Sequence, residues 1–147
     1  LVAMIDSVRV GIAWGDDVRP DGQLMANTWQ GQFPYRNTGA LGWVGTTPVG
    51  TFPPNGFGLV DMIGNVWEWT TTRYAPRHQN NPEVSGCCPA PSGDPAIMQT
   101  LKGGSHLCAP EYCHRYRPAA RSSQSQDSAT SHIGFRCIAD CGGESGL

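Results

Sequence analysis

Apolar and polar positions along the chain rarely follow the period of an amphipathic helix. Residues 66–74 read Val-Trp-Glu-Trp-Thr-Thr-Thr-Arg-Tyr, a β-branched and aromatic run that predicts a strand. Residues 133–139 alternate enough to predict a final strand, and residues 1–12 are mildly apolar, as in a strand or a short helix. We therefore expect short strands rather than long helices.

Irregular segments separate these runs. Gly, Asp and Pro make residues 14–22 rich in turns, and the Pro, Gly and Ser content of residues 76–100 predicts an exposed loop. Residues 142–147 are expected to form a frayed tail. Residues 25–57 space aromatic side chains with Gly, Asn and Thr, which predicts an irregular region that buries those side chains. They are Trp29, Phe33, Trp43 and Phe52.

Composition supports a compact, loop-rich domain, or a piece of one, in a chain of 147 residues. The 19 Gly and 12 Pro interrupt helices, and 39% hydrophobic residues argue against disorder. A net charge of −2 excludes a nucleic-acid binder that works through bulk positive charge. No apolar run reaches the roughly 18–20 residues that span a bilayer, so we expect neither nucleic acid nor a membrane as partner. No signal peptide is predicted; the compartment stays open, with the cytoplasm expected for a bacterial protein.

Two cysteines separated by four residues, Cys108 and Cys113, form the first candidate site. Paired thiolates are soft ligands that favour Cu(I), zinc or iron–sulfur centres. Zinc needs four ligands, and His106 or His114 could complete that set. A disulfide closing a small loop is the alternative, because the spacing alone is a weak signal and six cysteines leave the pairing open.

Two carboxylates flank a glycine-containing turn in the second candidate site, at Asp61 and Glu68. Carboxylate and backbone oxygens together suit Ca²⁺, whereas the alternative is a pair of ordinary solvated carboxylates. A third cluster, Arg115, Arg117 and Arg121, could bind a carboxylate or a peptide backbone. Ordinary surface arginines are the alternative there.

Six motifs resemble those of the formylglycine-generating enzyme family, the sulfatase-modifying factors. In chain order they are Ala-Asn-Thr-Trp-Gln-Gly at 26–31, Phe-Pro-Pro-Asn-Gly-Phe-Gly-Leu at 52–59, Gly-Asn-Val-Trp-Glu-Trp-Thr at 64–70, Lys-Gly-Gly-Ser-His-Leu-Cys-Ala-Pro-Glu-Tyr-Cys at 102–113, Arg-Tyr-Arg-Pro-Ala-Ala-Arg at 115–121 and His-Ile-Gly-Phe-Arg-Cys at 132–137. Trp-Glu-Trp and Gly-Phe-Arg-Cys mark only the wider superfamily. The set Ser105, Cys108, Tyr112 and Cys113 is specific to the enzyme.

The resemblance implies an α+β, C-type-lectin-like fold with little regular secondary structure, here incomplete. Residues 1–13 are a divergent N-terminal segment, residues 14–141 match the C-terminal half of the family domain, and residues 142–147 are a tail. We expect a poor catalyst on its own, one that self-associates or needs a missing N-terminal segment to cover exposed apolar surface. The aromatic side chains expected on that surface are Trp14, Trp29 and Trp43.

The activity that the resemblance implies is the copper-dependent oxidation, by O₂, of a cysteine in a sulfatase Cys-x-Pro-x-Arg motif to Cα-formylglycine. Cys108 and Cys113 would hold Cu(I) between two thiolates, and the substrate thiol would join them as a third sulfur. Ser105 and Tyr112 would complete the catalytic set. Three residues are implied in substrate binding: Trp67, Arg117 and Arg121.

The family also binds Ca²⁺. One site carries over whole, with side-chain ligands from Asp61 and Glu68 and carbonyl ligands from Gly64 and Val66. The positions of a second site correspond to Asn27, Thr28, Leu41 and Trp43. Leu41 replaces an Asp ligand there, so we expect that site to be weak or lost.

The remaining cysteines are not assigned to the copper site. Cys137 matches a family cysteine whose partner lies in the missing half, so we expect it to be free or paired with Cys141. Cys87 and Cys88 are adjacent, and we expect them to be dispensable for the chemistry because successive side chains of an extended segment point to opposite faces.

Two other functions remain open at this point. One is a catalytically silent, C-type-lectin-like module that binds a ligand or a protein. The other is a zinc or disulfide site with a structural role only. The presence of both loop thiols with Ser105 and Tyr112 favours the enzyme, because a binding module does not need that set.

Overall fold

The computed structural model describes residues 14–15, 17, 19–76, 97–109, 112 and 114–138. The described part contains two short 3₁₀ helices, η2 (Pro20–Gly22) and η3 (His114–Tyr116). Its strands are β1 (Trp67–Arg73), β2 (Met98–Lys102), β3 (Ser122–Ser125) and β4 (Ile133–Gly134). None of the described residues forms a helix long and apolar enough to cross a membrane.

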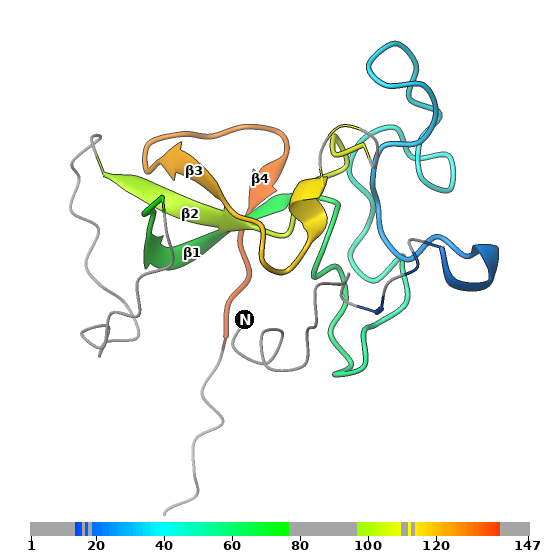
Figure 1. Cartoon of the computed structure of the whole chain (residues 1–147), viewed down its shortest axis with the longest axis horizontal. Helices are drawn as coiled ribbons and strands as arrows, with labels where there is room; N and C mark the ends of the chain where they lie inside the picture. The colour runs from blue at the N-terminus through cyan, green and yellow to red at the C-terminus, as the bar shows by residue number, and fades with distance from the viewer. Residues whose placement is uncertain are drawn as a thin grey trace, which may run out of the picture.

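The four strands form one sheet in the order β3-β2-β1-β4. β2 runs antiparallel to both of its neighbours, whereas β4 pairs in parallel with β1. In Figure 1 the sheet lies on the left, and the loops of residues 19–60, coloured blue to green, lie mainly on the right. The regular part of the fold therefore supports a larger irregular part.

The structure confirms the predicted strand at residues 66–74 as β1. The strand predicted at residues 133–139 is real but shorter, because β4 holds only Ile133–Gly134. The predicted loop at residues 76–100 is wrong at its end, where Met98 begins β2; residues 77–96 lie outside the described part. β3 was not expected at all, since its sequence, Ser-Ser-Gln-Ser, lacks β-branched and aromatic residues.

A buried cluster joins the sheet to the loops. Trp67 of β1 and Leu101 of β2 belong to it, and the loops supply its other members. These are Ala26, Met62, Ile63, Cys108 and Tyr116. The thiol of Cys108 thus belongs to the same core as the central strands.

The aromatic side chains of residues 25–57 differ in burial. Phe52 is buried, as predicted, and Trp29 and Phe33 are half-buried. Trp43 is 47% exposed, so the prediction of burial is wrong for this residue. The reason is local: Trp43 ends a tight turn in which its backbone N–H donates to the carbonyl oxygen of Ala40 at 2.9 Å, at the surface of the loop region.

Candidate active site

Cys108 lies in a tight, buried turn. Its backbone N–H donates to the carbonyl oxygen of Ser105 at 2.9 Å, and the N–H of Leu107 donates to the Ser105 hydroxyl oxygen at 3.3 Å. Ser105 and Ala109 are fully buried, and Cys108 is 4% exposed. The structure therefore places Ser105 and Cys108, two residues of the motif shared with the family, in one turn. The other predicted copper ligand, Cys113, lies outside the described residues.

An aromatic stack borders this turn. The ring of Tyr112, which is 73% exposed, stacks on that of Phe33 with centroids 4.7 Å apart and planes at 21°. Phe33 meets Trp29 edge to face, with centroids 5.2 Å apart. The backbone N–H of Trp29 donates to the carbonyl oxygen of Cys108 at 3.0 Å. Trp29 and Phe33 were not predicted to belong to the site, because nothing in the local sequence links them to a loop so distant along the chain.

His106 holds the turn from its other side. Its backbone N–H (3.0 Å) and its ring Nδ1 (2.9 Å) both contact the carbonyl oxygen of Asn65. Because a carbonyl oxygen can only accept, Nδ1 carries the proton in this arrangement. That nitrogen is consequently used to anchor the loop and is not available as a zinc ligand.

The side chain of Asn65 joins two further segments, those of Asn27 and Thr47. Its side-chain oxygen accepts from the Asn27 side-chain amide at 3.2 Å and from the Thr47 N–H at 2.9 Å, while its amide donates to the Thr47 carbonyl at 3.2 Å. Its φ of 57° is left-handed, a conformation that Asn tolerates better than most residues. The preceding Gly64, also left-handed, packs so closely that a Cβ there would lie 2.4 Å from the carbonyl oxygen of Asn27.

Both residues whose carboxylates were predicted to bind calcium contact one arginine, Arg136, Glu68 through its carboxylate and Asp61 through its backbone carbonyl. Its Nε and Nη2 donate to the Glu68 carboxylate at 2.6 and 2.5 Å, and these hydrogen bonds raise the pKa of the guanidinium. Nη2 also donates to the Asp61 carbonyl oxygen at 2.9 Å. The Asp61 carboxylate accepts from the Gly50 N–H at 2.7 Å. Sequence reasoning missed Arg136, although it lies in the Gly-Phe-Arg-Cys motif.

The positions of the second predicted calcium site are arranged differently. Asn27 is 1% exposed, and its side-chain oxygen has no hydrogen-bond partner among the described residues. Such an oxygen is a candidate ligand for a cation or a water molecule. Leu41, by contrast, is 62% exposed and can offer only its carbonyl group. The prediction of a weak or lost site stays a prediction.

The predicted substrate-binding residues lie in different surroundings. Trp67 is buried in the core cluster with Cys108. Arg117 is exposed, and its carbonyl oxygen accepts from Ala120 in a turn. The guanidinium carbon of Arg121 lies 5.7 Å from the centroid of the Tyr74 ring, just beyond the end of β1. The structure thus spreads the three residues from the core to the surface.

Lys102, on β2, lies near Arg121. Burial and, to a smaller extent, the charge of Arg121 lower the pKa of the Lys102 ammonium group. The ammonium donates to the carbonyl oxygens of Pro118 and Ala120, the latter at 2.7 Å. Lys102 therefore holds the arginine-rich segment 115–121 against the sheet.

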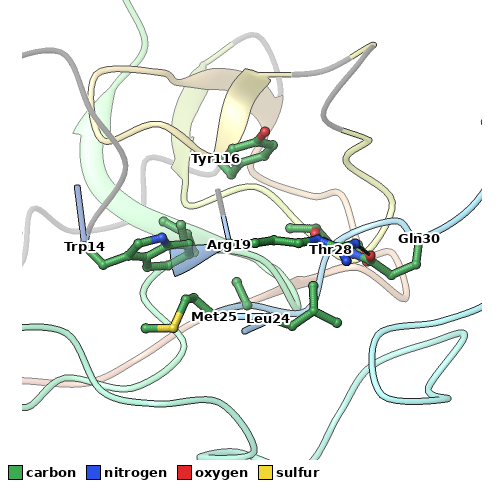
Figure 2. Close-up of a pocket in the computed structure, with 9 residues that line it drawn as sticks. Trp14, Arg19, Leu24, Met25, Thr28, Gln30 and Tyr116 are labelled. Carbon is green, nitrogen blue, oxygen red and sulfur yellow. Dashed lines mark hydrogen bonds between the residues drawn. The ribbon is translucent and has the colours of Figure 1, made fainter. Parts of the chain in front are cut away.

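A small cavity lies between Tyr116 and the segment of residues 14–30. Figure 2 shows the Arg19 side chain extending toward Gln30, whose side-chain oxygen accepts its hydrogen bond, with Trp14 and Met25 on the opposite side of the arginine from Gln30. The volume of the cavity, about 20 Å³, suits a single water molecule. It is too small to be a substrate pocket.

Comparisons with known proteins agree with the motifs. A family model described as "Sulfatase-modifying factor enzyme 1-like domain" matches residues 10–141. The formylglycine-generating enzyme of Mycobacterium tuberculosis is 73% identical over 132 residues, which cover 87% of this chain and 44% of that protein. A mouse protein named inactive C-alpha-formylglycine-generating enzyme 2 is 35% identical over 132 residues, covering 88% of this chain and 36% of that protein.

Among solved structures, Treponema denticola variable protein 1 matches with a TM-score of 0.50 and 26% sequence identity. The match covers 76% of this chain and 34% of that one. In each of these comparisons the chain spans less than half the length of the protein that it matches.

Proposed function

The chain belongs to the family of sulfatase-modifying factor enzyme 1-like domains, and from this premise we propose that it serves to oxidise a cysteine of a sulfatase polypeptide to Cα-formylglycine. The observation that carries the proposal is the 73% identity to a formylglycine-generating enzyme. A protein this similar over 132 residues has nearly the same core, and here that core includes Cys108.

The finer proposal is that the oxidation depends on copper and acts on the motif Cys-x-Pro-x-Arg. The donor chemistry fits: Cys108 offers a buried sulfur, Cys113 would supply a second one, and Cu(I) prefers soft thiolate ligands. Bound Cu(I) would supply a centre at which O₂ is reduced next to the substrate thiol. The overall change balances as R-CH₂-SH + O₂ + 2 H⁺ + 2 e⁻ → R-CHO + H₂S + H₂O, with the two electrons coming from a thiol reductant.

The residues around Cys108 orient the substrate and exclude water. The Ser105 hydroxyl is fully buried, where it can hold a proton without exchange with bulk water. Tyr112 presents its ring to solvent beside the turn, where it can lie along a bound peptide. We assign Trp67 to packing beneath the site, and Arg117 and Arg121 to carboxylates or carbonyls of the sulfatase chain.

We also propose a structural Ca²⁺ site formed by the carboxylates of Asp61 and Glu68 and the carbonyls of Gly64 and Val66. A carboxylate has about four lone-pair positions, so the two hydrogen bonds from Arg136 leave others on Glu68 for a cation. A ligand that binds only the native state stabilises it by mass action. Ca²⁺ should therefore raise the melting temperature of the chain, and less so in Glu68→Ala; equal shifts in both would contradict the assignment.

The second candidate function is a catalytically silent binding module. It is favoured by the 35% identity to a relative that is named inactive. The larger identity to the M. tuberculosis enzyme and the buried Cys108 turn support the enzyme instead. Under the binding-module alternative, the two thiols could be removed without consequence for the interaction.

A peptide assay tests the proposal. The chain, loaded with one equivalent of Cu(I), is mixed with a stoichiometric amount of a Cys-x-Pro-x-Arg peptide, O₂ and a thiol, so that even one slow turnover is detected. Mass spectrometry should show that the peptide loses the mass difference between a CH₂SH group and a CHO group. Hydrazide labelling should show that the product is an aldehyde. The double variant Cys87→Ser/Cys88→Ser is the matched control and should convert the peptide like the parent. Conversion that survives Cys108→Ser would contradict the assigned site.

A further inference from the structure

The segment of residues 29–33 contacts the loop that carries Cys108 and Tyr112 at two points. The backbone N–H of Trp29 donates to the carbonyl oxygen of Cys108 at 3.0 Å, at the beginning of the loop. The Phe33 ring stacks on Tyr112, four residues further on, with centroids 4.7 Å apart. The edge-to-face contact between Trp29 and Phe33 ties the two points together.

Tyr112 needs such a contact because most of its ring faces solvent. Its side chain is 73% exposed, so the stack on Phe33 is the main described restraint on the ring. Its backbone N–H donates to the Ala109 carbonyl at 3.1 Å and closes the turn that follows Cys108. A restraint on the Tyr112 ring is therefore also a restraint on the turn that follows Cys108.

We propose that Phe33 is a positioning residue that holds Tyr112 by stacking and thereby keeps the turn that carries Cys108 ordered. Phe33 has no atom with which to bind a metal or carry a proton, so it acts only through Tyr112. An aromatic stack favours the ordered form of the loop over its disordered form by a factor of about two to ten. The effect on Cu(I) binding rests on the proposed function, whereas the ordering of the Cys108 turn does not.

Two measurements on Phe33→Leu test the inference: Cu(I) affinity by competition with a chromophoric chelator, and the alkylation rate of Cys108 by peptide mapping without metal. We expect affinity to fall about two- to tenfold and the buried Cys108 to react faster by a similar factor. Phe33→Tyr, which keeps the ring, should match the parent. Tyr35→Leu, a loss of an 82% exposed aromatic from the same loop, should match it too.

The outcomes separate this inference from the proposed function. A parent that binds no Cu(I) would overturn the copper proposal, and the alkylation rate would still decide the role of Phe33. Unchanged affinity and an unchanged rate in Phe33→Leu would overturn the positioning role, as would equal losses in Tyr35→Leu. If Phe33→Leu lacks a cooperative melting transition, Tyr112→Leu removes the same stack from the exposed side and should likewise raise the alkylation rate of Cys108.

Discussion

Replacing Arg136 with methionine would remove the partner of a buried carboxylate. The Glu68 side chain is 11% exposed, and both of its oxygens accept hydrogen bonds from the Arg136 guanidinium. The same guanidinium also binds the carbonyl oxygens of Val60 and Asp61 at 3.2 and 2.9 Å. Methionine keeps much of the apolar stem but leaves all of these acceptors without their donor.

The expected cost follows from the burial of the pair. Removing one partner of a fully buried ion pair costs about 3–5 kcal/mol, because the other charge stays buried and uncompensated. The Arg136 side chain is 31% exposed, so water screens part of the charge and lowers the expected loss to about 2–3 kcal/mol. That is a large share of the roughly 5–15 kcal/mol by which domains are stable.

Urea unfolding, followed by tryptophan fluorescence in the presence of EDTA, measures this loss. The double variant Glu68→Gln/Arg136→Met is the control: with no buried charge left, it should be more stable than Arg136→Met alone. Added Ca²⁺ should stabilise Arg136→Met more than it stabilises the parent, because in the variant a cation also compensates the charge of Glu68, and it should stabilise the double variant little. A free energy of unfolding for Arg136→Met within about 0.5 kcal/mol of the parent, the range of ordinary surface substitutions, would refute the reasoning.

Two further predictions concern the backbone and the pH dependence of stability. Gly64→Ala should destabilise the chain more than Gly58→Ala. The two glycines have nearly the same φ, +74° and +75°, but of the two only Gly64 would bring its new Cβ against the backbone, 2.4 Å from the Asn27 carbonyl oxygen. Equal urea midpoints for the two variants would contradict this. Burial and, to a smaller extent, the charge of His106 lower the pKa of His132, so the unfolded chain binds a proton more readily than the native one. Stability should therefore fall as the pH drops below about 6.5, and His132→Gln should flatten that fall; a profile unchanged by the substitution would show that His132 is not its cause.

The fold could be predicted from the sequence where local chemistry determines the structure. Residues 66–74 form a strand because aromatic and β-branched side chains favour one, and the α+β, C-type-lectin-like fold implied by the resemblance is confirmed by the family match. β3 is the opposite case. Its Ser-Ser-Gln-Ser sequence becomes a strand because β2 offers a partner edge, with Thr100 opposite Ser123 and Leu101 opposite Ser122.

The candidate site divides in the same way. Ser105 and Cys108 are close in sequence and share one turn, so their proximity could be predicted. The contacts of Phe33 with Tyr112 and of Arg136 with Glu68 join segments that only the tertiary fold brings together. A single sequence holds no local signal for such pairs.

An anaerobic Cu(I) titration tests the central claim most directly. The reduced chain should bind one equivalent of Cu(I), with two sulfur ligands visible by X-ray absorption. Cys108→Ser and Cys113→Ser should each lose most of that affinity, because one thiolate cannot form the two-sulfur site, while Cys87→Ser/Cys88→Ser should keep it. Unchanged affinity and stoichiometry in both single variants would contradict the account.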